Sequence, residues 1–155
     1  MSSQDEDRPD HSGEIVRGAR HRRQRLRASM DALEAAIAAA APGREGDWRQ
    51  RVGMVLADMA PVLDEHIAET EAPDGLLERV LADAPRLAHA VEVLRDDHAR
   101  LREMLAAARA PLGGDAGAEE VRSAAVDLLG LLVRHRHRGA DVLYEAYSVD
   151  VGTGD

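Results

Sequence analysis

Four histidines are spaced along this 155-residue chain so that each of its four long helical patterns carries one: His21, His66, His98 and His135. The last three fall on the apolar stripe of their helix, where a solvent-facing histidine is not expected. Neutral imidazole is a common metal ligand, and helical bundles build metal sites from side chains that face one another across the core. The spacing therefore predicts a metal site inside a helical bundle.

Two further residues are candidate ligands at the same depth. Glu69 follows His66 by three residues, about 60° round the helix, and can reach the same pocket. His21 is level with His66 when each helix is measured at about 1.5 Å per residue. However, it lies about 140° from the stripe of Leu26, on which Arg23 falls. We expect His66, His98 and His135 to be the first ligands, followed by His21 and Glu69.

The charged neighbours of these histidines are predicted to face solvent. Asp96 and Asp97 precede His98 and lie off its stripe as read from the leucines. His137 is about 160° round the helix from His135 and is predicted to face water. The arginines between residues 17 and 27 are expected to form a solvated helix face that pairs with acidic residues such as Asp31 and Glu34.

Composition favours an all-α fold. Alanine, leucine, arginine and glutamate dominate, whereas there are two tyrosines, one tryptophan and no phenylalanine. Straight-chain residues lose little entropy in a helix, and a sheet core would need β-branched and aromatic side chains. The absence of cysteine excludes disulfides, thiolate metal sites and cysteine nucleophiles. The formal charge of −9 argues against general nucleic-acid binding, because phosphates would be repelled.

Breaker residues divide the chain into helices. Proline and glycine signals and candidate caps at Asp47, Asp83 and Asp115 predict long helices at about residues 14–41, 47–72, 85–109 and 118–147. Pro61 must kink the second helix or mark a fresh start. A short apolar piece, residues 76–81, is expected between the second and third helices. The predicted fold is an up-down-up-down four-helix bundle over residues 14–147, with a disordered tail at 1–13 and a second tail at 148–155.

The chain resembles the hemerythrin-like, or HHE cation-binding, family of four-helix bundles. The resemblance is carried by His21, by residues 63–71 (LDEHIAETE), by residues 94–101 (LRDDHARL) and by His135, and it spans about residues 14–147. It implies a non-haem di-iron centre held by histidines and two bridging carboxylates. It also implies roles in oxygen or nitric oxide binding, iron handling or redox sensing.

The chain departs from the family at both bridging positions. The carboxylate expected four residues after the second-helix histidine is replaced by Thr70, and the equivalent position after His135 is Gly139. Two iron ions a few Å apart repel strongly, and neutral imidazoles do not offset that repulsion. The residues therefore suit a single ion, iron or zinc, or a site that no longer binds metal.

A metal-free reading stays open. In it the chain is a helical interaction module with structural core histidines, and its alanine-rich faces allow a homodimer through the first helix. A third reading is a pH-responsive bundle whose buried histidines charge on acidification. No nucleophile motif is present, and we do not assign an enzyme. No signal-like or membrane-spanning apolar run is seen, so a cytoplasmic location without membrane partners is expected.

Overall fold

The computed structural model describes residues 11–39, 43–114 and 117–148, and this part of the chain is almost entirely helical, with no strand. The long helices are α1 (His11–Ala38), α2 (Glu45–Glu71), α4 (Ala88–Arg109) and α5 (Ala118–Tyr147). A short helix, α3 (Leu76–Asp83), and 3-10 turns at Pro85–Leu87 and Ala110–Gly113 lie in the connections. The predicted all-α fold with an extra short helix is confirmed.

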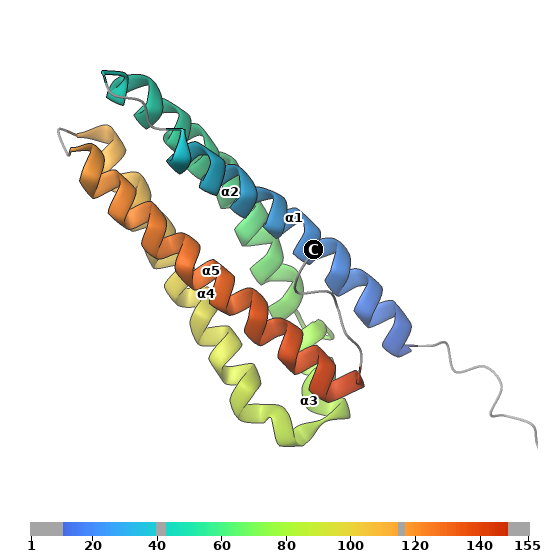
Figure 1. The fold of residues 1–155 in the computed structure, drawn as a ribbon. Helices are drawn as coiled ribbons and strands as arrows, with labels where there is room; N and C mark the ends of the chain where they lie inside the picture. Colours follow the sequence, from blue (N-terminus) through green and yellow to red (C-terminus); the bar gives the residue numbers. More distant parts are fainter. Residues whose placement is uncertain (1–10, 40–42, 115–116, 149–155) are drawn as a thin grey trace, which may run out of the picture.

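The four long helices form an up-down-up-down bundle (Figure 1). α1 lies beside α2, and α4 lies beside α5; contacts of α1 with α5 and of α2 with α4 close the ring. α3 covers the end of the bundle at which α2 connects to α4 (Figure 1). Successive long helices are therefore antiparallel neighbours, as short connections require.

The core consists of aliphatic stripes that face one another. On α1, Leu26, Met30 and Leu33 recur at spacings of four and three and are buried. The same spacing on the other long helices adds further side chains to this cluster, including Met59, Leu63, Leu101, Leu105, Leu128 and Leu131. Apolar burial at these positions holds the four helices at fixed rotations, and this fixes the direction in which each polar residue on a stripe points.

A second cluster closes the α3 end of the bundle. Leu77 and Val80 of α3 are buried against Leu94 of α4 and Val142 of α5. α3 is too short to be stable alone, and its apolar face is covered by the ends of α4 and α5. It therefore forms an apolar cover over one end of the bundle interior.

The predicted ends of the first helix were wrong by a few residues. α1 begins at His11 rather than Glu14 and ends at Ala38 rather than Ala41. The helix includes Gly13, which costs only about 1 kcal/mol inside a helix. Residues 11–13 thus form the first turn of α1. The rest of the tail predicted at 1–13, and residues 149–155 of the other, lie outside the described residues.

Two predicted helix caps were also wrong. α2 begins at Glu45, and Asp47 lies in its first turn, where a negative charge is favourable beside the helix dipole. Asp83 ends α3 and accepts a hydrogen bond from the Tyr147 hydroxyl at 2.7 Å instead of capping the next helix. The third cap, Asp115, lies outside the described residues. α2 runs continuously through the exposed Pro61, so this residue does not mark a fresh start.

The last helix has the predicted bounds, 118–147, and ends at Ser148 in a left-handed conformation, with φ of 52°. None of the described helices combines the length and the apolar character that crossing a bilayer requires.

Candidate metal centre

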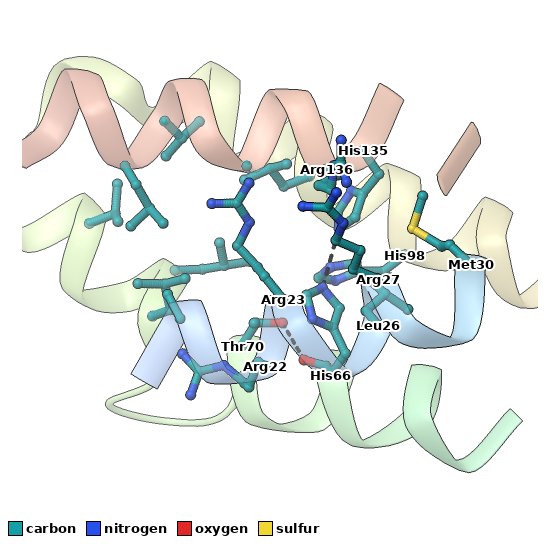
Figure 2. A pocket seen from close by; sticks show the side chains of 18 residues that line it. Arg22, Arg23, Leu26, Arg27, Met30, His66, Thr70, His98, His135 and Arg136 are labelled. Carbon is teal, nitrogen blue, oxygen red and sulfur yellow. Dashed lines mark hydrogen bonds between the residues drawn. The ribbon is translucent and has the colours of Figure 1, made fainter. Parts of the chain in front are cut away.

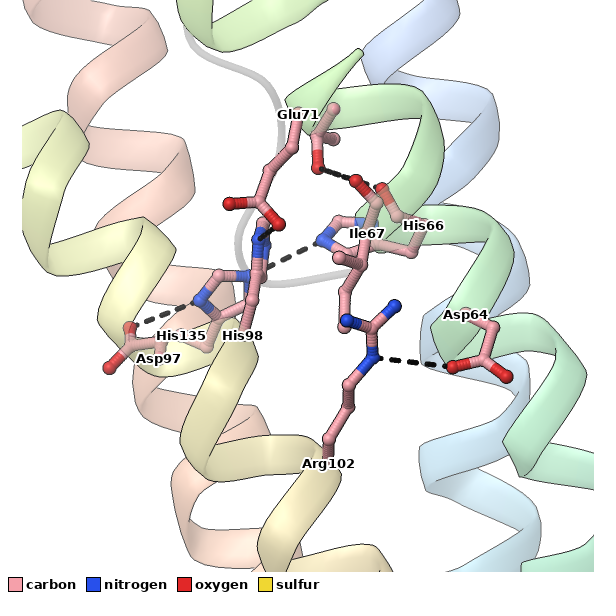
Figure 3. A network of polar contacts seen from close by, with 9 residues as sticks. Asp64, His66, Ile67, Glu71, Asp97, His98, Arg102 and His135 are labelled. Carbon is pink, nitrogen blue, oxygen red and sulfur yellow. Dashed lines mark hydrogen bonds and ion pairs between the residues drawn. The ribbon is translucent and has the colours of Figure 1, made fainter.

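Three of the predicted histidines meet inside the bundle. His66 comes from α2, His98 from α4 and His135 from α5, and one nitrogen from each lies within 4.8 Å of the others. The Nε2 atoms of His66 and His135 are 3.3 Å apart. All three ring pairs are close to edge-on, with centroids 4.8 to 5.5 Å apart. Figure 3 shows His66 pointing across the bundle toward His98 and His135.

Each ring points inward because its helix stripe is buried. His98 and His135 are 3% and 4% exposed. His66 retains some exposed surface as a residue, but its Nδ1 atom is buried. On α2 the fully buried Leu63 precedes His66 by three residues, and Leu101 of α4 follows His98 by three. Helical periodicity therefore carries the rings to the interior, as predicted.

Asp97 orients His135, and the prediction that Asp97 faces solvent was wrong. Asp97 is only 2% exposed. Nδ1 of His135 lies 3.0 Å from Oδ2 of Asp97, and Nη1 of Arg138 donates to Oδ1 at 2.5 Å. Because an ionised carboxylate only accepts, Nδ1 of His135 carries the hydrogen that this contact needs, and in the corresponding tautomer the lone pair is on Nε2, the nitrogen that faces His66. Fixing the tautomer in this way is typical of metal-ligating histidines.

The charge on Asp97 is favoured by its partners. Burial disfavours the carboxylate, but the hydrogen bonds from His135 and Arg138 outweigh it and hold the pKa of Asp97 below its usual value. The Arg138 side chain is 40% exposed, so its charge keeps contact with water. Asp97 is therefore an ionised, buried support for one imidazole.

The Glu71 carboxylate lies near a second imidazole, although it makes no hydrogen bond with that ring. Its Oε2 lies 3.3 Å from Nδ1 of His98, and its side chain is 31% exposed. The sequence offered Glu71 only as a nearby carboxylate off the expected offset and not as a ligand, since it is five positions beyond His66, at the end of α2. Its carboxylate faces His98 from the end of the neighbouring helix (Figure 3).

The imidazoles of His66 and His98 favour the neutral form, which is the form that binds metals. Burial, followed by the neighbouring His135 and His98, lowers the pKa of His66 to about 3. Burial, followed by His135, lowers the pKa of His98 to about 3, even though Asp97 acts in the opposite direction. Both rings therefore present lone pairs at neutral pH without first losing a proton to water.

The spacing of the nitrogens fits a metal ion. Two imidazole nitrogens bound at about 2.0–2.1 Å with a tetrahedral angle are about 3.3–3.4 Å apart. The Nε2 atoms of His66 and His135 are 3.3 Å apart. The third nitrogen lies within 4.8 Å of the other two and would have to move closer to complete a tetrahedral set. Three imidazoles can thus hold one ion in this helical protein.

The other two predicted ligands lie outside this cluster. His21 is exposed on α1. Glu69 has a side chain 43% exposed, and its Oε2 lies 3.8 Å from Nε of Arg22. The periodicity of α1 explains why His21 is exposed, because Arg23 takes the inward position two residues later and lines the bundle interior. Glu69 lies on the side of α2 that faces α1, where it lines a small pocket together with Arg22 and His66.

The arginines of α1 divide between the surface and the interior. Arg25 pairs with Glu65 at 2.5 Å, across to α2 rather than with the predicted Asp31 and Glu34. Arg22 and Arg23 are only partly exposed, so this part of the run is not the solvated face that we predicted. His137 is exposed, as predicted.

The positions expected to carry bridging carboxylates have other roles. The Thr70 hydroxyl is buried and donates to the carbonyl of His66 at 2.7 Å, one turn earlier in α2. Gly139 borders the cavity next to the histidines, and a Cβ added there would meet nothing within 4 Å. Neither residue supplies an anionic oxygen.

An apolar cavity of about 50 Å³ is lined by residues of α1, α2, α3, α4 and α5, the three histidines among them. Figure 2 shows His66, His98 and His135 gathered in its wall, with the Arg23 side chain reaching from α1 toward α5. A ligand of the ion would therefore be enclosed by aliphatic side chains and arginines.

No family model, no curated protein and no solved structure matches this chain.

Proposed function

We propose that this chain is a metal-binding protein of the hemerythrin-like type, in which His66, His98 and His135 hold one divalent ion. The convergence of three imidazoles from three helices, within 4.8 Å and next to a buried aspartate, supports the proposal. Iron is our first candidate and zinc the second, since imidazole suits both. The resemblance to the hemerythrin-like family stays a proposal and rests on the motifs described above.

A single ion fits the charges better than a di-iron centre. Asp97 is already held by His135 and Arg138, and Glu71 is partly exposed beside His98. Among the described residues that line the cavity there is no aspartate or glutamate to bridge two ions. Two adjacent cations without anionic bridges would repel each other strongly in a buried site.

Three protein ligands leave a coordination position for a small molecule. In metal sites with three protein donors, the remaining position is taken by water or a substrate. Binding of oxygen or nitric oxide, metal sensing and metal storage are the roles that we propose for such a site. A cytoplasmic location and a homodimer through α1 stay predictions.

Metal analysis tests the proposal. The protein is reconstituted with Fe²⁺ or Zn²⁺ under reducing conditions, desalted and analysed for metal, and we expect one ion per chain. The His98→Ala variant is expected to bind the ion at least about a hundredfold more weakly. The binding free energy of a structural zinc site, about 10–16 kcal/mol, corresponds to roughly 3 kcal/mol for each of four ligands, and the variant loses one ligand. His89→Ala is the matched control, since His89 is an exposed histidine of the same helix.

Two results contradict the proposal. One is a folded wild-type protein without stoichiometric metal after reconstitution; a metal-free helical interaction module would then be the better description. The other is metal binding that His98→Ala leaves unchanged, which would place the ion elsewhere. The melting temperature of each variant shows that it is folded before its metal content is compared.

A further inference from the structure

Glu71 brings a carboxylate to the edge of the histidine cluster, where this group makes no hydrogen bond. Its Oε2 lies 3.3 Å from Nδ1 of His98, and that nitrogen is buried without a hydrogen-bond partner. The contact is not an ion pair at neutral pH either, because burial lowers the pKa of His98 to about 3 and the ring is neutral. Figure 3 shows Glu71 reaching from the end of α2 toward this ring. The contact alone therefore does not explain why a carboxylate lies beside the buried imidazoles.

The other acids near the cluster already have partners. Asp97 accepts hydrogen bonds from His135 and Arg138. The three remaining acids between residues 64 and 71 of α2 each pair with an arginine: Asp64 with Arg102, Glu65 with Arg25 and Glu69 with Arg22. Among these acids of the described chain, only Glu71 has no arginine partner.

A divalent ion among the three imidazoles needs an anionic ligand. Imidazoles bind metals as neutral donors and bring no negative charge, and the charge of Asp97 is offset by Arg138. Thr70 and Gly139 supply no carboxylate. A charge away from water is costly unless an opposite charge accompanies it. Glu71 is the carboxylate beside the cluster that is available for this purpose.

We infer that Glu71 is an exchangeable fourth ligand of the ion, which closes the metal site at rest and gives up its position to an incoming small molecule. Three imidazole nitrogens and one carboxylate oxygen make a complete tetrahedral set. The exchange breaks one bond between Glu71 and the ion and forms one bond to the small molecule, with no change of oxidation state. The inference rests on the proposed function and names the residue that opens the coordination position.

The position of Glu71 in the fold suits an exchangeable ligand. Glu71 is the last residue of α2, and its side chain is 31% exposed. The carboxylate can therefore turn between the ion and solvent about its own side-chain bonds, without a change in the backbone. His98 and His135 are buried and have no such freedom.

A role of Glu71 in orienting His98 is the alternative, and Glu71→Gln separates the two. In the orienting role, an oxygen of residue 71 accepts a hydrogen bond from Nδ1 of His98, and the side-chain amide of glutamine keeps such an oxygen. The amide carries no charge to offset that of the ion. The substitution therefore spares the orienting role and removes the anionic ligand.

Co²⁺ is the probe, because its visible absorption depends on the number and type of its ligands. Competition with a chromophoric chelator gives its Kd, and sodium azide, a small anion that binds an open coordination position, is then titrated into the loaded protein. We expect Glu71→Gln to bind Co²⁺ roughly tenfold or more weakly, less than the roughly hundredfold loss for His98→Ala because water takes the vacated position. We also expect its absorption to differ from that of the wild type. Azide is expected to bind the variant several-fold more tightly, since no side chain competes for the position.

Glu65→Gln is the matched control, because Glu65 is a partly exposed acid of the same helix whose carboxylate pairs with Arg25. It removes the same charge from α2 and is expected to keep the wild-type affinity, absorption and azide binding. Thermal unfolding of the metal-free variants shows that both are folded before they are compared.

Three results overturn the inference, and they differ in what they leave of the proposed function. If the wild type takes up no stoichiometric Co²⁺, Fe²⁺ or Zn²⁺, both are overturned. If the wild type binds one ion per chain and Glu71→Gln matches it in affinity and absorption, Glu71 is not a ligand and the site of three imidazoles stands. If the affinity falls while absorption and azide binding stay those of the wild type, Glu71 only positions His98.

Discussion

Neutralising Asp97 isolates the part of the proposed site that does not touch the ion. Asp97 is 2% exposed, and its two oxygens are engaged by His135 at 3.0 Å and by Arg138 at 2.5 Å. The Asp97→Asn variant keeps the size of the side chain and removes its charge. The amide can also rotate its NH₂ group toward Nδ1 of His135, which would favour the tautomer with the hydrogen on Nε2, the nitrogen that faces His66.

The expected size of the effect follows from these contacts. Loss of a hydrogen bond to a charged group costs about 1.5–3 kcal/mol, which is roughly ten- to a hundredfold in an equilibrium constant. Substitution of residues that orient metal-ligating histidines lowers metal affinity by the same range, about 10–100-fold. We therefore expect Asp97→Asn to bind the ion 10–100-fold more weakly than the wild type, with all three histidines still present.

A competition titration against a chromophoric chelator measures this change for Zn²⁺ or Co²⁺. Asp96→Asn is the matched control, since Asp96 is the exposed neighbour on the same helix. Thermal unfolding of the metal-free variants separates lost affinity from lost structure; Arg138 is 40% exposed and can be solvated without its partner. A folded Asp97→Asn protein whose affinity is within twofold of the wild type would refute the argument that Asp97 sets the tautomer of His135.

Three other perturbations test the fold and the charge state. Burial lowers the pKa of His66 and of His98 to about 3 in the folded protein, whereas a histidine in the unfolded chain has a pKa of about 6.5. Between these two pH values the unfolded chain therefore binds more protons than the folded protein. The metal-free protein is thus expected to lose stability as the pH falls from about 6.5 toward 3, by about 1.4 kcal/mol per ring at pH 5.5; equal urea midpoints at pH 7.5 and 5.5 would contradict this. Leu63→Ala removes a side chain that is 0% exposed and should cost about 2–5 kcal/mol in urea unfolding, whereas Val126→Ala, at 49% exposed, should stay within about 0.5 kcal/mol. Gly139→Ala adds a methyl group where nothing lies within 4 Å, and a gain of about 0.5–1 kcal/mol in thermal unfolding is expected from helix propensity; a loss would show that the site needs the glycine.

The meeting of the three histidines could be predicted because periodicity is a strong signal in long helices. The leucines around His66, His98 and His135 are spaced by three and four, and such a stripe has only one way to face a core. The same periodicity placed Arg23 rather than His21 on the inward face of α1, and the structure agrees with it. The family resemblance favoured His21, which is exposed.

Asp97 shows how the site was partly missed. It lies three residues after Leu94 and four before Leu101, so it also fits a buried stripe. The prediction placed only His98 and the apolar residues on the buried face of α4, and Asp97 was therefore assigned to the surface. Its partner Arg138 follows His135 by three residues on the facing helix. The contact of Glu71 with His98 could not be predicted, since it depends on where α2 ends along the length of α4. The periodicity of a helix predicts which of its faces is buried. How far neighbouring helices are shifted along the bundle axis depends on tertiary packing.

The ligands are distributed unevenly over the bundle. α2, α4 and α5 each contribute an imidazole, whereas α1 contributes only cavity wall. An outward movement of the first part of α1 would therefore open a route from solvent to the cavity while leaving all three nitrogens in place. Exchange of a small ligand and release of the ion would then proceed at separate rates, the first governed by opening of one helix and the second by separation of the other three.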